Sequence, residues 1–518
     1  MNNKASNIRS AALIVLSAVL LVLSFPGYNY YFLAWFAFVP LFFAIENQKA
    51  SGAFRLTYLA GVIFFLGTVY WLMHVTLPGM VVVVLYLALY IGLFGLLITP
   101  RLRKNCYKTL FFIPSAWVAV ELVRSHFLTG FGWNLLGYSQ APFRPIIQIA
   151  DITGAYGVSF LMVLVNIAIF FTIKDIRKKN NNFTYLALAV FIVYLAITYG
   201  TYRLKNIFTG ERLRVAVIQG NIPQKHKWDS KFREEIITKY LNLTKKASSE
   251  KPDLIIWPES SVPGLLESER DLFAAVKGLA VELKVPILVG TPREDPVFRD
   301  VYYNSAVLFD EGGRIVDRYN KIHLVPFGEY VPLRSALSFV DNFAPSPIGD
   351  FTPGDNYTVF RFFTERAVTD MNLSWKLVKK VGFSCLICFE DVFPDLSREF
   401  VKRGASFLVN ITNDAWYERT SATYQHNQNL IFRAVENRVN AVRAANTGLS
   451  CFIDQKGEIV DRVESNGEYI FIDGYKTKDI TLTRARTFYM VFGDVFAYGC
   501  LIYTILYIIL ERRKKWSI

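Results

Sequence analysis

Long apolar runs are the feature that most constrains this chain. A helix needs about 20 largely apolar residues to cross a bilayer, and runs of that length fill most of the first 200 residues. At 53% hydrophobic and 15% aromatic residues, the 518-residue chain is too apolar for an ordinary soluble enzyme. We expect about eight membrane-spanning helices, at residues 10–26, 29–45, 56–76, 79–99, 109–126, 155–173, 183–200 and 488–510.

Basic residues gather at particular ends of these runs. Lysines and arginines follow the fourth run at 101–108 and the sixth at 174–179, and they close the chain at 512–515. The positive-inside rule then puts both termini in the cytoplasm and residues 201–487 across the membrane. Since no small-residue cleavage site follows the first run, we expect that helix to be retained. The net charge of +14 is explained by this topology, and no nucleic-acid partner is expected.

From Leu213 the pattern changes to short β-branched runs separated by amphipathic stretches, which is typical of a layered α/β domain. The expected domains are a transmembrane domain at 1–212, a catalytic domain at 213–475, and a final helix with a basic tail at 476–518. The strands predicted in the second domain are "LRVAVIQGN", "DLIIWPES", "PILVGTP", "NSAVLFD", "GFSCLICFED", "ASFLVNITND" and "LSCFIDQKG". Its predicted helices are 230–249, 267–283, 395–403 and 423–443.

Three predicted strand ends carry ionisable residues in distinctive settings. "IIWPES" presents Glu259, "RYNKIHLVPFGEYVP" presents Lys321 and Glu329, and "CLICFED" presents Cys388 and Glu390. A glutamate, a lysine and a cysteine are the components of a thiol-nucleophile site for acyl transfer.

The two cysteines in "GFSCLICFED" have the C-x-x-C spacing of redox and zinc sites. Residues alternate between the two faces of a strand, so Cys385 and Cys388 should point apart, and no second cysteine pair exists for zinc. Cys385 is expected to pack in the core, and Cys388 falls where the apolar run ends. A Cys–His dyad with His323 or His426 remains an alternative.

Together these motifs resemble the nitrilase (carbon–nitrogen hydrolase) superfamily. The resemblance rests on "IIWPES", "YNKIHLVPFGEYVP", "ICFED" and "NDAWY…QHNQNLIFRAVENRVNAVRAANTG". The flanking apolar runs and "TGFGWNLLGYSQ" are similar to its membrane-bound branch, the apolipoprotein N-acyltransferases. This implies a polytopic α-helical membrane domain joined to an αββα sandwich. It also implies that Glu259 is the general base, Lys321 the oxyanion stabiliser and Cys388 the nucleophile.

The resemblance extends to residues around this triad. Glu329 and Glu390 match carboxylates that support it, and Trp228 and Trp416 match aromatic residues of substrate loops. Many members carry tyrosine directly after the nucleophile, whereas this chain has Phe389. The role of that hydroxyl is therefore open here, although we count Phe389 among the expected substrate-binding residues.

The implied reaction moves a fatty acyl chain from a membrane phospholipid to the N-terminal amino group of a diacylated apolipoprotein, through a cysteine thioester. The implied protein is a monomer of the bacterial inner membrane, with its catalytic domain on the periplasmic side and with no cofactor or metal. Residues 332–351 are expected to form a mobile lipid-facing arm, with an ordinary packed loop as the alternative. Glu121 and Arg124 are expected to pair with each other, with a path for lipid headgroups as the alternative. The alternatives are a membrane-tethered amidohydrolase that transfers the acyl group to water, and a transporter or scaffold with a degenerate domain.

Overall fold

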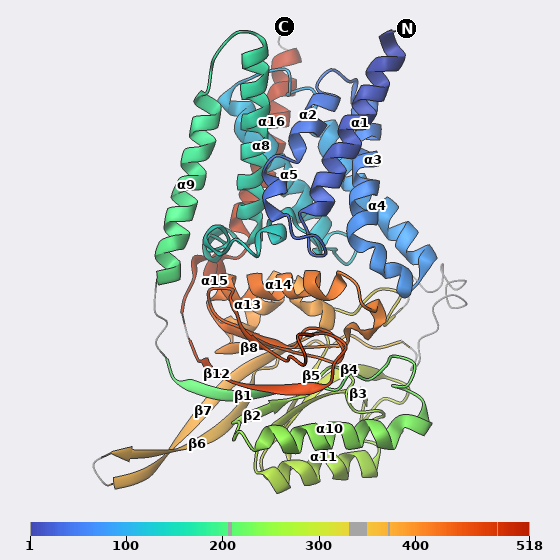
Figure 1. Cartoon of the computed structure of the whole chain (residues 1–518), viewed down its shortest axis with the longest axis vertical. Coiled ribbons are helices and arrows are strands. Elements are labelled where there is room, and N and C mark those ends of the chain that lie inside the picture. Colours follow the sequence, from blue (N-terminus) through green and yellow to red (C-terminus); the bar gives the residue numbers. More distant parts are fainter. Residues whose placement is uncertain (1, 206–209, 331–349, 371–372, 484, 517–518) are drawn as a thin grey trace. The chain divides into compact units, whose positions relative to one another are not determined.

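The computed structural model describes residues 2–205, 210–330, 350–370, 373–483 and 485–516. They form two compact units (Figure 1). The helical unit comprises Met1–Asn206, Thr420–Glu436 and Thr487–Ile518, and the sandwich unit comprises Ile207–Arg419 and Asn437–Arg486. Both units draw on separated stretches of sequence, and the expected boundaries at 212 and 475 stay a prediction.

Helices make up the first unit, and several lie side by side in Figure 1. Among the described residues, five helices are long and apolar enough to cross a membrane, and 7–23 and 31–45 are shorter apolar stretches. The main helices are α1 (Asn2–Leu23), α2 (Phe38–Ile45), α3 (Ala50–Val69), α4 (Leu77–Ile98), α5 (Tyr107–His126), α8 (Ala155–Arg177), α9 (Thr184–Lys205), α14 (Ala422–Asn437) and α16 (Val495–Trp516). Short helical turns are η1 (Tyr31–Trp35), η2 (Tyr70–His74), η3 (Leu136–Gln140), α6 (Arg144–Ile147), α7 (Ala150–Thr153) and α15 (Phe488–Phe492).

Two of the expected spans are interrupted. The run 29–45 is split into η1 and α2, and buried Asn166 on α8 satisfies the backbone at the break. Its side chain accepts from Phe38 N at 2.8 Å and donates to the carbonyl of Ala34 at 2.9 Å. An exposed backbone break would be costly in an apolar environment, so this polar side chain makes the interruption possible. The run 488–510 is likewise divided into α15 and α16, with Gly493 between them at φ +63°.

Two six-stranded sheets form the sandwich unit, in the orders β12-β1-β2-β3-β4-β5 and β11-β10-β9-β8-β7-β6. The first contains β1 (Arg212–Gln219), β2 (Leu254–Ile256), β3 (Ile287–Glu294), β4 (Tyr302–Phe309), β5 (Ile315–Asn320) and β12 (Gly474–Thr481). The second contains β6 (Phe360–Asp370), β7 (Leu373–Ile387), β8 (Phe407–Thr412), β9 (Asn440–Ala445), β10 (Cys451–Ile453) and β11 (Ile459–Arg462). The expected combination of a helical domain with a two-sheet α/β sandwich is present.

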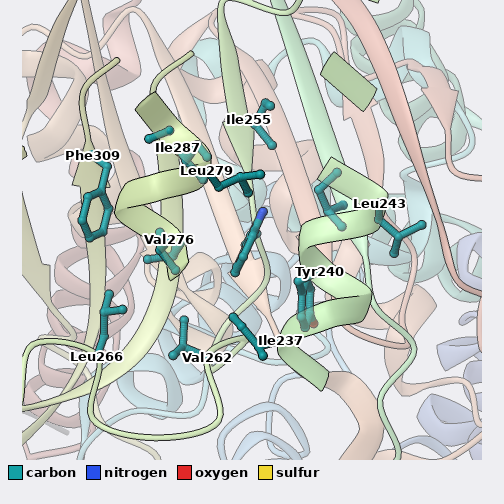
Figure 2. Close-up of a cluster of buried hydrophobic side chains, with 14 of the residues drawn as sticks. Ile237, Tyr240, Leu243, Ile255, Val262, Leu266, Val276, Leu279, Ile287 and Phe309 are labelled. Carbon is teal, nitrogen blue, oxygen red and sulfur yellow. The ribbon is translucent and has the colours of Figure 1, made fainter. Parts of the chain in front are cut away.

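Helices α10 (Arg233–Ser248) and α11 (Arg270–Leu283) pack on the first sheet through a buried apolar cluster (Figure 2). Ile237 and Tyr240 of α10 are spaced to share one face of the helix. Tyr240 stacks on Trp257, whose indole donates to the hydroxyl of Thr244 at 2.8 Å. Trp257 follows β2 directly, so this packing fixes the chain just before Glu259.

All seven strands predicted from the sequence are present, at shifted boundaries. The first three predicted helices are present as well. They correspond to η4 (Ser230–Phe232) with α10, to α11, and to α13 (Pro394–Lys402). The predicted helix 423–443 is wrong in its last third. Helix α14 ends at Asn437, and residues 440–445 form β9, which pairs in parallel with β8. The small and β-branched residues of "VNAVRAA" are buried on both faces of the sheet, and this tertiary pairing overrides the helical pattern.

Candidate active site

Each predicted catalytic residue lies just beyond the end of a strand, as expected. Glu259 follows β2, Lys321 directly follows β5, and Cys388 directly follows β7. Cys388 opens the short helical turn η6 (Cys388–Val392) and has φ +53°, a left-handed conformation that is uncommon for a non-glycine residue. Strained residues of this kind cluster at active sites. Cys385 lies within β7, whereas Cys388 lies just past its end. The two cysteines therefore differ because the strand ends between them, and the alternation of side chains along a strand does not apply to Cys388.

Glu259, Lys321 and Glu329 form one charged cluster around the buried ammonium of Lys321. The Lys321 ammonium lies 2.9 Å from Glu329 Oε2 and 3.8 Å from Glu259 Oε1, and its side chain is only 1% exposed. Burial disfavours the charge on Lys321, but Glu329 and Glu259 outweigh this effect and raise its pKa above the usual value. Lys321 therefore remains a cation over the whole working pH range.

Asn304 on β4 joins the two carboxylates, and sequence analysis missed it. Its amide nitrogen donates to Glu259 Oε1 at 2.7 Å and to Glu329 Oε1 at 2.8 Å. The other oxygen of Glu259 accepts from the backbone N–H of Asn413 at 2.9 Å. The carboxylate of Glu259 is thus fixed at both oxygens. Asn304 lies inside the predicted strand "NSAVLFD", where nothing but its polarity marks it.

The carboxylate of Glu390 joins the segment that carries Lys321 to the end of β7. One carboxylate oxygen accepts from Tyr319 Oη at 2.7 Å and from the backbone N–H groups of Ile322 and His323 at 2.7 and 3.1 Å. The other accepts from Ile387 N at 2.7 Å. Burial raises the pKa of Glu390 to about 7, although these donors favour the ionised form. All its described partners are structural groups, so Glu390 positions the loops that carry Lys321 and Cys388.

The Cys388 side chain is buried, with 7% exposure. Burial and the charge of Glu259 raise the pKa of its thiol, while Lys321 and the hydroxyl of Thr412 act in the opposite direction. The resting residue is therefore a thiol, and it would have to lose its proton in order to act as a nucleophile.

A fully buried arginine supports the turn at Cys388. Asn410 donates to the carbonyl of Cys388 at 3.1 Å, and Arg443 donates to Asn410 Oδ1 at 2.6 Å. Arg443 also forms ion pairs with Asp391 at 3.2 Å and Asp414 at 3.0 Å.

A second buried lysine lies beside Glu259. Lys227 is 3% exposed, and its ammonium donates to the main-chain carbonyl of Glu259 at 3.0 Å. Burial lowers its pKa to about 8, against the opposing influence of Glu259 and Cys388. In "QKHKW" only its neighbour Trp228 was predicted as a site residue, because nothing local marks this lysine.

The aromatic residues predicted to bind substrate differ in exposure. Trp228 and Phe389 are half-buried, and Trp416 is 41% exposed. The ring of Phe389 meets Phe393 edge-on, with 5.2 Å between centroids. No substrate is present, and a substrate-binding role for the three stays a prediction.

The two histidines of the alternative dyad have aromatic neighbours in the part of the chain that the structure describes. The ring of His323 stacks on Phe393, with centroids 4.1 Å apart, and burial lowers its pKa. His426 packs in the helical unit against Trp133. Among the described contacts of His323, none is with Cys388.

The side chains of Glu121 and Arg124 both form hydrogen bonds with the backbone of residues 133–136. Glu121 accepts from Leu136 N at 2.7 Å, and Arg124 donates to the carbonyl of Trp133 at 2.7 Å. Among the described side chains, no ion pair within 4 Å joins the two, although their charges act on each other over a longer distance. The predicted arm at 332–351 lies outside the described residues, apart from its last two positions.

Two family models match this chain. Residues 17–168 match the apolipoprotein N-acyltransferase N-terminal domain, and residues 214–485 match carbon-nitrogen hydrolase. A protein of Geobacter metallireducens named apolipoprotein N-acyltransferase is 40% identical over 98% of this chain and 96% of its own length. A protein of the same name from Chlorobaculum tepidum is 28% identical over 97% of this chain and 96% of its own.

Solved structures that align with part of this chain include members of the nitrilase superfamily. An amidase from Nesterenkonia AN1 aligns with 53% of this chain and 93% of its own, at 18% identity and a TM-score of 0.37. A superfamily member from Saccharomyces cerevisiae aligns with 54% of this chain and 92% of its own, at 17% identity and a TM-score of 0.38.

Proposed function

The chain belongs to the apolipoprotein N-acyltransferases, and on this premise we propose how it performs acyl transfer. The donor is a membrane phospholipid, and the acceptor is the N-terminal α-amino group of a diacylglyceryl-modified apolipoprotein. The two half-reactions share one thioester on Cys388. Glu259 is the general base, and the ammonium of Lys321 stabilises the oxyanion.

In the first half-reaction, the thiol of Cys388 gives its proton to Glu259 as sulfur attacks the ester carbonyl of the phospholipid. Negative charge collects on the carbonyl oxygen, where the Lys321 ammonium stabilises it. The carbon–oxygen bond then breaks, Glu259 returns the proton to the leaving lysophospholipid, and the acyl chain remains on sulfur. The raised thiol pKa supports this coupling, because the thiolate forms only as the bond forms.

In the second half-reaction, the α-amine of the apolipoprotein attacks the thioester. Glu259 takes a proton from the nitrogen, the carbon–sulfur bond breaks, and Glu259 passes that proton to the sulfur of Cys388, which restores both the thiol and the base. The same base serves both steps, so its carboxylate must keep one orientation. The bonds from Asn304 and Asn413 N to its two oxygens support that requirement.

The observation that carries these roles is the position of Lys321. A buried ammonium 3.8 Å from Glu259, at the end of the strand preceding Glu329, is suited to an oxyanion and not to a surface ion pair. We further propose that the protein works as a monomer in the bacterial inner membrane. Its termini lie in the cytoplasm and the sandwich unit lies in the periplasm.

The test uses the full-length purified protein. It is incubated with phospholipid in detergent micelles, the peptide containing Cys388 is analysed by mass spectrometry, and a diacylated lipopeptide is then added. We expect an acyl adduct on Cys388 that disappears as the lipopeptide amine is acylated. Cys388→Ser should lose the adduct, while Cys385→Ser, a matched control in the same segment, should keep it. Release of free fatty acid alone would indicate an amidohydrolase-type reaction with water.

A further inference from the structure

Lys227 is a buried cation that the proposed triad does not use. Among the described residues, its single hydrogen bond is the one to the main-chain carbonyl of Glu259 at 3.0 Å. An ammonium carries three N–H donors, and burying one with so few partners is costly. A buried ammonium with one hydrogen bond must be stabilised by the charges around it.

The negative charges around Cys388 can stabilise the ammonium of Lys227. The nearest carboxylate to the Lys321 ammonium is Glu329, with both oxygens within 3.0 Å, and Glu259 is farther away at 3.8 Å. One ammonium therefore faces two carboxylates. A thiolate on Cys388 would bring further negative charge into the same buried region, where charges are weakly screened.

We propose that Lys227 is the second cation of this site. It is a positioning residue that holds Glu259 by its main-chain carbonyl and offsets the negative charge that develops on Cys388. This inference rests on the triad proposed above and extends it. With Lys227 protonated, the ammonium groups of Lys227 and Lys321 lie in the same buried region as Glu259 and Glu329, and proton transfer from Cys388 to Glu259 leaves the net charge of the region unchanged.

The charge state of Lys227 makes the role measurable. The titratable groups that act on it are Glu259 and Cys388. Because burial lowers its pKa to about 8, Lys227 is mostly protonated at neutral pH and loses its charge as pH rises through that value. Loss of a nearby cation raises the pKa of a thiol. The reactivity of Cys388 should therefore rise less steeply with pH above this point than below it.

The experiment measures alkylation of Cys388 by iodoacetamide in the full-length protein, from about pH 6.5 to about pH 9.5, by mass spectrometry of its peptide. Lys227→Met should slow alkylation at neutral pH about tenfold, which corresponds to a rise of one unit in the thiol pKa. Lys227→Arg should restore most of the rate. Exposed Lys225 lies in the same segment, and Lys225→Met is the matched control.

The outcomes separate a charge role from packing. If Lys227→Met keeps the wild-type pH profile, the proposal is overturned, even if the variant transfers acyl chains slowly. If that variant does not fold, the wild-type profile decides, since a constant slope through pH 8 contradicts the proposal. Alkylation needs neither phospholipid nor lipopeptide. A shifted profile in a protein that transfers nothing would thus overturn the proposed function and leave the role of Lys227 standing.

Discussion

The side-chain amide of Asn304 donates to Oε1 of Glu259 at 2.7 Å, and the same nitrogen donates to Glu329. One amide therefore fixes the spacing of two carboxylates that compete for Lys321. Asn304 lies on β4, and Glu259 follows β2, so this relationship depends on the first sheet being assembled.

Asn304→Leu should lower the rate of acyl transfer by about 100-fold, comparable to the loss of one well-placed donor at an active site. Without the amide, Glu259 can rotate toward Lys321 and away from the thiol. The measurement is kcat with phospholipid and lipopeptide. Asn356→Leu is the control, because Asn356 is exposed. A near-normal kcat for Asn304→Leu would show that the carboxylate needs no such support.

Removing the charge of Glu259 should affect alkylation and catalysis in opposite directions. Glu259→Gln removes a negative charge that raises the pKa of the Cys388 thiol, so iodoacetamide should react faster at a given pH. Acyl transfer should be lost, because the base is absent. Slower alkylation in this variant would mean that Glu259 also takes the thiol proton during alkylation, and that this assistance outweighs its effect on the pKa of the thiol.

Glu390→Gln should destabilise the sandwich unit by about 1–3 kcal/mol, the usual cost of a buried hydrogen-bonding group without a partner. Four donors converge on the two carboxylate oxygens, and an amide offers only one acceptor oxygen. Thermal unfolding in detergent measures the loss. An unchanged unfolding temperature would contradict the inference that Glu390 holds the loops carrying Lys321 and Cys388 in position.

Arg443→Met should unfold the sandwich unit far more easily, at a cost of about 3–5 kcal/mol, because Asp391 and Asp414 would be left buried without their cation. The matched control is Arg403→Met, which removes an exposed pair with Glu399 and should cost less than about 1 kcal/mol. Equal effects of the two variants on denaturant unfolding would refute the distinction.

The pattern of apolar runs and strand ends was enough to predict much of this protein. It predicted the helical domain, seven of the strands, and Glu259, Lys321 and Cys388 as residues just beyond strand ends. These features depend on local properties, namely the length of an apolar run, the period of alternation and the residue that follows a strand.

Other features depend on contacts between residues far apart in the chain. Nothing local distinguishes Asn304 from any strand asparagine, Lys227 from exposed Lys225, or β9 from the end of a helix. Their roles arise when sheet pairing brings segments separated by tens to hundreds of residues within hydrogen-bonding distance, as between Lys227 and Glu259 or between β8 and β9. Local sequence patterns were sufficient to predict Glu259, Lys321 and Cys388 as the reacting groups. Only the folded chain shows which buried groups orient these residues and place charges beside them, as Asn304 and Lys227 do for Glu259. Burial and pairing between distant segments exist only in the folded chain.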